Sequence, residues 1–181
     1  MTQTSATPPY TLAADEKAAQ VMAYTLNNLY WGEVVVKNMI RVSTWLRTNS
    51  APDRLTLYNA RVMNIISGTQ VKPLAVTNLN VAVSQVLAFH LVPPAKDPPD
   101  YDPTEPNRIM EPVSLLVGSF RMDGSLRLSS RSSMEKYLEV TRENFTGVYD
   151  AKITNTLLPG LGMIQVPFLL VRQETAIFMH P

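Results

Sequence analysis

The sequence predicts a mainly β protein made of two tandem small antiparallel β-barrels that arose by internal duplication. Three observations lead to this prediction: short runs of β-branched and aromatic residues between turn residues, a proline-rich segment that divides the chain, and ordered matches between the two parts. A half-length unit of about four to six short strands cannot stack two full sheets, so it most readily curls on itself as a small barrel.

The ordered matches are the argument for duplication. The octet LYNARVMN (Leu57–Asn64) returns as VYDAKITN (Val148–Asn155), at an offset of 91 residues. Three further pairs keep the same order, with offsets of 86 to 89 residues: IRVST at 40–44 with LRLSS at 126–130, AFHLVPP from Ala88 with IFMHP from Ile177, and Gly32 with Gly118. A nearly constant offset is typical of a repeated unit. Short strands of alternating polarity resemble one another in any case, so a single larger β-sandwich stays open as the alternative.

The N-terminal part is expected to form a flexible tail at 1–10 and a helix or lid at 11–28. The tail is rich in Thr, Ser and Pro. The run TLAADEKAAQVMA follows, in which Thr11 can cap a helix and Asp15 and Glu16 suit its positive N-terminal end. Its alanines favour helix. This helix is expected to cover one end of a barrel, and docking on a partner is the alternative.

The first barrel is predicted at 29–92. Its strands are read in LYWGEVVVK, NMIRVSTWLR, RLTLYNARVMNII and SQVLAFHLV, with NSAPD and SGTQ as turns. In NMIRVSTWLR, apolar Ile40 and Val42 alternate with Arg41 and Ser43, which indicates a half-buried strand.

An acidic proline-rich connector is predicted at 93–112. This stretch holds seven of the 14 prolines of the chain. Proline removes backbone donors and prevents both helix and central strand, so the segment is read as extended and semi-rigid.

The second barrel is predicted at 113–181. The run VSLLVGSFRMDGSLRLSS predicts a hairpin that turns at Met122–Ser125, with Asp-Gly as the turn dipeptide. SSMEKYLEVTRENF predicts one short helix within 132–145, capped by Ser132 or Ser133. GVYDAKITN, MIQVPFLLVR and TAIFMH are strands again. Each unit has the size of an Sm-like or PilZ-like barrel, and the last strand of each unit, in SQVLAFH and QETAIFM, is expected at an edge or a closure.

No catalytic residue, metal ligand or cofactor is predicted, and the chain is not expected to be an enzyme. It has no cysteine and two histidines, and no phosphate-binding glycine loop or G-x-S-x-G motif occurs. His90 and His180 end the two closing strands, and repetition explains their placement better than a shared metal site. Calcium binding by the connector acids is a minor alternative, because the glycine of a calcium loop is missing.

Charge is distributed unevenly along the chain. The segment 32–62 carries five basic and two acidic residues, a net charge of +3, whereas 93–112 carries two basic and five acidic residues, a net charge of −3. In one interpretation the connector docks on a basic barrel face of the same or a neighbouring chain, through Asp97, Asp100, Tyr101, Asp102 and Glu105. In the other, RNA, single-stranded nucleic acid or a cyclic dinucleotide binds by stacking and phosphate pairing at Arg41, Trp45, Arg47, Arg54 and Tyr58.

The runs RVSTWLRTNSAPDRLTLYNA and SQVLAFHLVPP, with the acidic connector, resemble an uncharacterised bacterial family of small β-rich proteins with a domain of unknown function. The resemblance extends from about Trp31 to the end. It implies no activity and no functional residues.

The predicted function is that of a non-catalytic interaction or assembly module, a structural protein that self-associates or scaffolds a larger complex. Exposed closing strands favour a homo-oligomer or contacts with other protein subunits. The net charge of +1 gives no general affinity for nucleic acid, so the nucleic-acid or nucleotide regulator is the alternative. The sequence has no signal peptide and no apolar run long enough to span a bilayer, which makes a cytoplasmic protein the expectation.

Overall fold

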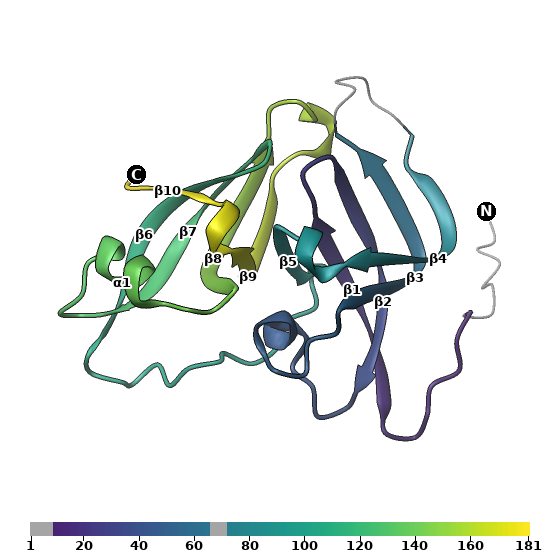
Figure 1. Cartoon of the computed structure of the whole chain (residues 1–181), viewed down its shortest axis with the longest axis horizontal. Helices are drawn as coiled ribbons and strands as arrows, with labels where there is room; N and C mark the ends of the chain where they lie inside the picture. Colours follow the sequence, from purple (N-terminus) through teal and green to yellow (C-terminus); the bar gives the residue numbers. More distant parts are fainter. Residues whose placement is uncertain (1–8, 66–71) are drawn as a thin grey trace.

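The computed structural model in Figure 1 describes residues 9–65 and 72–181, and these residues form a mainly β protein. All ten strands belong to one antiparallel sheet. A seven-residue α-helix and four 3-10 helices connect them. In chain order the elements are β1 (Glu16–Tyr24), β2 (Asn28–Lys37), η1 (Val42–Arg47), β3 (Arg54–Asn64), β4 (Leu74–Ala82), η2 (Val83–Gln85), β5 (Ala88–Leu91), β6 (Arg108–Val117), β7 (Phe120–Ser129), α1 (Met134–Val140), β8 (Phe145–Asn155), η3 (Pro159–Leu161), β9 (Ile164–Arg172), η4 (Gln173–Thr175) and β10 (Ile177–Met179).

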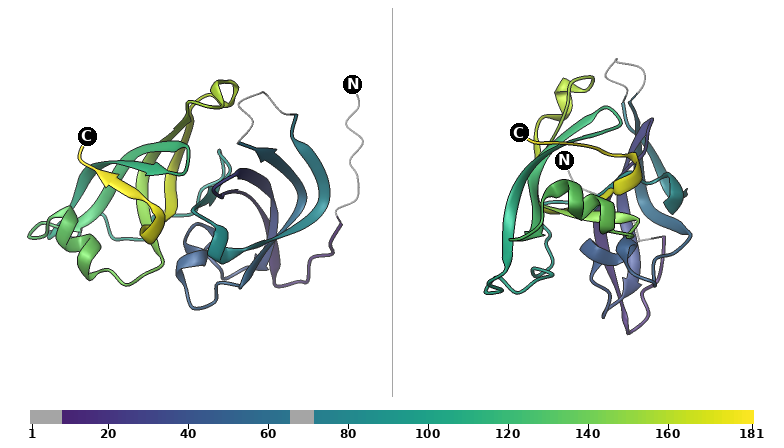
Figure 2. Two further views of the ribbon diagram at one scale, coloured as in Figure 1. Left: turned by 45° about the horizontal axis from the view of Figure 1, so that its top comes forward. Right: turned by 60° about the vertical axis from the view of Figure 1, so that its left-hand side comes forward.

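The strands lie in the order β10-β6-β7-β8-β9-β5-β1-β2-β3-β4. The first half of the sheet contains β1–β5 and the second half contains β6–β10. In each half the last strand returns beside the first, so β5 pairs with β1 and β10 pairs with β6. One further pairing, β5 with β9, joins the two halves. The mainly β prediction is confirmed. The ten strands form one continuous sheet that is not closed, so the two tandem barrels stay a prediction. β4 and β10 are its two edges, at opposite ends of the molecule (Figures 1 and 2).

Two hydrophobic cores lie on opposite faces of this sheet. Val21 and Ala23 of β1 point into the first core, which is formed mainly by residues of the first half, such as Leu55. Met22 and Tyr24 of the same strand point into the second core, which is formed mainly by the second half. Because successive side chains of a strand point to opposite faces, β1 contributes residues to both cores. The strands at the centre are buried on both faces, so the halves share their interior.

The expected N-terminal helix at 11–28 is wrong, because residues 16–24 form β1. Alanine and acidic residues favour helix locally, but burial decides the outcome. A strand between two cores needs apolar residues on both faces, and the last four residues of β1 are buried. Since β1 pairs with β2 and β5, the first half begins at Glu16 and not at residue 29.

The expected strand in NMIRVSTWLR is also wrong. Residues 42–47 form the 3-10 helix η1, and Val42 and Leu46 fill the first core from it. A helical turn can therefore also bury the apolar residues of this alternating run, and the Ser43 amide donates to the Asp97 carboxylate. In SQVLAFHLV only Ala88–Leu91 is strand, since η2 precedes it.

The hairpin of the second half turns earlier than expected. β6 ends at Val117 and β7 begins at Phe120, with Gly118 at φ 58° in the turn. Asp123 and Gly124 lie inside β7, at a register shift against β8. A Cβ atom on Gly124 would lie 2.8 Å from the Tyr149 carbonyl oxygen, so glycine is needed there for close strand approach.

The connector has no helix or strand between β5 and β6, and β6 begins at Arg108, inside the predicted range 93–112. Pro112 is accommodated in β6 opposite Ser125. In the second half, α1 lies within the segment expected to be helical, and the Ser133 side chain accepts a hydrogen bond from the Lys136 amide at its N-terminus.

Candidate functional site

The acidic connector is docked on η1 of the first half. The Arg47 guanidinium donates to Asp100 Oδ2 at 2.9 Å, and Arg41 Nη1 donates to the Pro99 carbonyl oxygen at 3.1 Å. The Ser43 amide donates to Asp97 Oδ2 at 2.8 Å. Three contacts to η1 and to Arg41, which precedes it, therefore hold the start of the connector against the same chain.

Asp100 also connects the first half to the second. Its Oδ1 atom accepts the Tyr149 hydroxyl at 2.7 Å, so both carboxylate oxygens are used, and its side chain is nearly buried. Burial, with the Asp100 carboxylate, raises the pKa of the Tyr149 hydroxyl well above 10.0, which keeps this hydroxyl a donor at neutral pH. Arg47 has a second ion pair with Glu143 at 3.4 Å.

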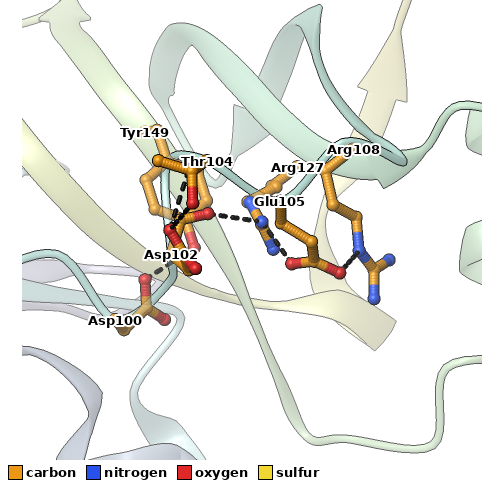
Figure 3. A network of polar contacts seen from close by, with 7 residues as sticks. All are labelled: Asp100, Asp102, Thr104, Glu105, Arg108, Arg127 and Tyr149. Carbon is orange, nitrogen blue, oxygen red and sulfur yellow. Dashed lines mark hydrogen bonds and ion pairs between the residues drawn. The ribbon is translucent and has the colours of Figure 1, made fainter.

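The end of the connector is held by Arg127 of β7 (Figure 3). Arg127 donates to the Asp102 carbonyl oxygen and to the Glu105 carboxylate, and Arg108 binds the other Glu105 oxygen at 3.0 Å. The two arginines lower the pKa of Glu105, and bonds from Thr104 lower that of Asp102. Asp97, Asp100, Asp102 and Glu105 therefore all have partners within the chain.

Tyr101 packs on the same surface. Its ring lies edge-on to Tyr149, with 5.2 Å between the ring centroids, and the Arg127 guanidinium lies 4.6 Å from its centroid. The Tyr149 ring in turn contacts that of Phe168, with 5.1 Å between the ring centroids. A cavity of about 450 Å³ opens beside these rings and the connector residues Ala95–Tyr101.

The five residues considered for nucleic-acid contact have separate partners. Arg41 and Arg47 hold the connector, and Trp45 packs against the first core while its indole N–H donates to the Ser50 carbonyl oxygen at 3.1 Å. Arg54 is exposed at the start of β3. The Tyr58 ring contacts that of Tyr10 at a tilt of 52°, with 4.8 Å between the ring centroids. In the described part of the chain, no hydrogen bond, ion pair or ring contact joins any two of the five.

Sequence reasoning missed Tyr10, Arg127 and Tyr149 as residues that hold these segments. Tyr10 precedes β1, and its ring contacts that of Tyr58. In the same way Tyr101 precedes β6, and its ring contacts that of Tyr149. The two tyrosines of each pair are separated by the same number of residues. The sequence held a signal for these contacts, because the tyrosines of the runs PPY and PPDY have the same offset as the two octets.

The two edges of the sheet are the other candidate surface. β4 runs for nine residues without proline, glycine or charge. At the opposite edge, Leu116 of β6 lies directly across from Ile177 of β10, and the two side chains are 39% and 60% exposed. A long uncharged edge strand is an available template for pairing with another strand.

The two histidines have unrelated environments. His90 is fully buried, between the Tyr24 hydroxyl at 2.9 Å from Nε2 and the Leu91 carbonyl oxygen at 2.7 Å from Nδ1. Burial lowers the pKa of His90 to about 4. His180 pairs with Glu135 at 3.0 Å on the surface, and this bond lowers the pKa of Glu135 to about 2. Among the described residues, no group of three or more His, Cys, Asp or Glu side chains is arranged to hold a metal ion.

No described helix has the length and apolar character needed to cross a bilayer. A scan of family models, a search of curated proteins and a search of solved structures each found nothing that matches this chain. The resemblance to a bacterial family of β-rich proteins therefore stays a prediction.

Proposed function

We propose that this chain is a duplicated pair of barrel-like units that serves, in the cytoplasm, as a non-catalytic assembly module. In this role it self-associates or scaffolds a larger complex. The single observation that carries the proposal is strand pairing between the units: β5 and β9 already join the two units, while β4 and β10 are outward edges that pair with no second strand among residues 9–65 and 72–181.

The duplication is supported by matching irregularities. Asn59 and Asp150, the third residues of the two octets, both have positive φ, at 47° and 50°. Non-glycine residues rarely adopt this conformation, so its repetition at equivalent points is informative. Gly32 and Gly124 also correspond, since each lies at a register shift and close to the carbonyl oxygen of the octet tyrosine.

An assembly role accounts for the arginines better than nucleic-acid binding does. The guanidinium groups of Arg41 and Arg47 are bonded to the connector, and the net charge of +1 gives little long-range attraction to phosphate. Strand addition at an edge needs no special side chain, because the main chain supplies the hydrogen bonds.

Light scattering over a range of protein concentrations, at low and high salt, tests the proposal. The expected result is a mass above that of one chain that grows with concentration and persists in salt. A strictly monomeric particle at high concentration, with no partner protein retained, would overturn it. Nucleic acid that co-purifies and is released by salt would favour the regulator instead.

A further inference from the structure

We propose that β10 of one copy pairs antiparallel with β4 of the next, so that copies join head to tail through a repeat of the internal β5·β9 junction. This inference rests on the proposed assembly function and names its partner, a second copy of this chain. It follows from the equivalence of strands in the two halves, from exposed apolar side chains at one edge and from the composition of the other.

The strand registers identify equivalent positions. Ala23 pairs with Phe89 in the first half and Leu115 pairs with Phe178 in the second, so β5 corresponds to β10 with Phe89 at the place of Phe178. In the same way Arg54 pairs with Ala82, and Phe145 pairs with Arg172. β4 therefore corresponds to β9, with Ala82 at the place of Arg172.

These equivalences give the register between copies. Inside the chain, Ala88 lies opposite Val171 and Phe89 lies opposite Leu170. Transferred to the free edges, Ile177 of one copy lies opposite Val81 of the next, and Phe178 lies opposite Asn80. Because Arg172 N–H bonds to the Leu87 carbonyl oxygen, the neighbouring pair Ala88–Val171 is a non-hydrogen-bonded pair, and so is Ile177–Val81.

Exposed apolar residues mark the β10 edge as incomplete. Tyr24 and Ala88 of the first half are buried against the second half, with exposed fractions of 1% and 0%. Their equivalents are Leu116 and Ile177, which stay exposed on the side of the sheet that points away from the second core. In the head-to-tail arrangement these two side chains extend the first core of the next copy, as Tyr24 and Ala88 extend the second core here.

The contact between copies is more polar than the internal junction. Phe145 and Leu170 enter the first core from the second half, but their equivalents on the β4 side are Arg54 and Asn80. We therefore expect reversible association that depends on concentration. Since the two edges differ from each other, the contact is heterologous and leads to a closed ring or an open filament.

The absence of cysteine from the sequence allows a direct test by disulfide trapping. Ile177→Cys in one preparation and Val81→Cys in another are mixed and oxidised, and a covalent dimer is expected, because directly opposite non-hydrogen-bonded residues have the Cα spacing of a disulfide. Ile177→Cys mixed with Asn80→Cys, one residue out of register, is the matched control and should give at least about tenfold less dimer. The double variant Ile177→Cys/Val81→Cys should give a ladder of covalent oligomers.

A second variant separates this contact from other modes of association. Ile177→Glu, which places a charge in the contact, should weaken association by about tenfold or more, whereas Met39→Glu, at a side chain that is 90% exposed and far from both edges in sequence, should not. Association that persists in Ile177→Glu without the specific disulfide would overturn the inference and leave the assembly function standing. A monomeric parent protein at high concentration would overturn the inference, and it would overturn the assembly function as well if no partner protein is retained.

Discussion

The two halves of this molecule contain equivalent strands that have different neighbours. β5 and β9 lie side by side at the centre, while their equivalents β10 and β4 form the two edges. The central pair is apolar, with Phe89 opposite Leu170, and the corresponding edge positions are Phe178 and Asn80. The comparison shows how one strand framework can provide a permanent junction or an available edge, depending on a few side chains.

The largest expected effect comes from replacing an apolar residue of the central β5·β9 junction by the polar residue at the corresponding position of the β4 edge. Leu170→Asn replaces a fully buried leucine by the residue at its β4 equivalent, and it leaves both a cavity and a buried amide. We expect the free energy of unfolding to fall by about 3–5 kcal/mol, measured by urea denaturation. The matched variant Asn80→Leu should change it by less than about 0.5 kcal/mol. A loss below about 1 kcal/mol for Leu170→Asn would show that the junction is dispensable.

Arg172 is the next difference between the junction and the edge, since Ala82 takes its place in β4. Its Nε donates to the Val86 carbonyl oxygen at 2.8 Å, Nη2 donates to that of Val83, and the guanidinium lies 4.5 Å from the Phe145 ring centroid. Arg172→Met keeps the apolar stem and leaves both carbonyl groups without these bonds. We expect a loss of about 2–3 kcal/mol in the free energy of unfolding.

Glu174→Gln is the control for this substitution, because Glu174 is exposed and 3.8 Å from the guanidinium. It should cost less than about 0.5 kcal/mol. Equal effects of the two substitutions would mean that the ion pair, and not the carbonyl bonds, stabilises the junction.

The closing strands differ also in acid response, because His90 of β5 corresponds to Met179 of β10. His90 is neutral in the folded protein, with a pKa lowered from 6.5 to about 4 by burial. The unfolded chain binds more protons between these values, so the stability is complete above pH 6.5 and is lost as the pH falls toward 4. We expect a decrease of about 2 kcal/mol between pH 7 and pH 5, by urea denaturation.

His90→Met, which copies the second half, should remove most of this pH dependence even though it lowers stability at pH 7 by exposing the Tyr24 hydroxyl to a site without an acceptor. An unchanged pH dependence in His90→Met would assign it instead to carboxylates whose pKa is lowered in the folded protein, such as those of Asp123 and Glu135.

The octets are the part of the proposed repeat that could be read from the sequence. Tyr58 and Tyr149 lie at corresponding positions of β3 and β8, and the offset between Ala88 and Ile177 is consistent with the strand registers. The Gly32–Gly118 match was wrong, because Gly118 forms a turn and Gly124 is the equivalent of Gly32. A glycine in a strand-like run indicates either a turn or a close approach, and only the neighbouring strand decides which.

The match of IRVST with LRLSS was also wrong, since 40–44 leads into η1 and 126–130 is almost entirely strand. The candidate site was predictable in part: the charge pattern indicated that the connector docks on arginines, and Arg41 and Arg47 do contact it. Arg127 could not be found in this way, because it lies in a strand of the other half. Long-range pairing of this kind has no local signal.

The smallest expected effect distinguishes the two octet tyrosines. The Tyr149 hydroxyl donates to Asp100, and its ring contacts that of Tyr101. The Tyr58 ring contacts that of Tyr10, but its hydroxyl has no hydrogen bond within the described residues. Tyr149→Phe should lower the free energy of unfolding by about 1–2 kcal/mol, because the Asp100 carboxylate loses a short bond at a nearly buried position. Tyr58→Phe should cost less than about 0.5 kcal/mol.

A double variant tests what the connector contributes to the contact between the two halves. If Tyr149→Phe is combined with Arg47→Met, the two losses should not add, because both substitutions act on the Asp100 carboxylate. Additive losses would mean that Arg47 stabilises the protein through Glu143 instead. Non-additivity would identify Asp100 as the residue through which η1 of the first half and β8 of the second are held together.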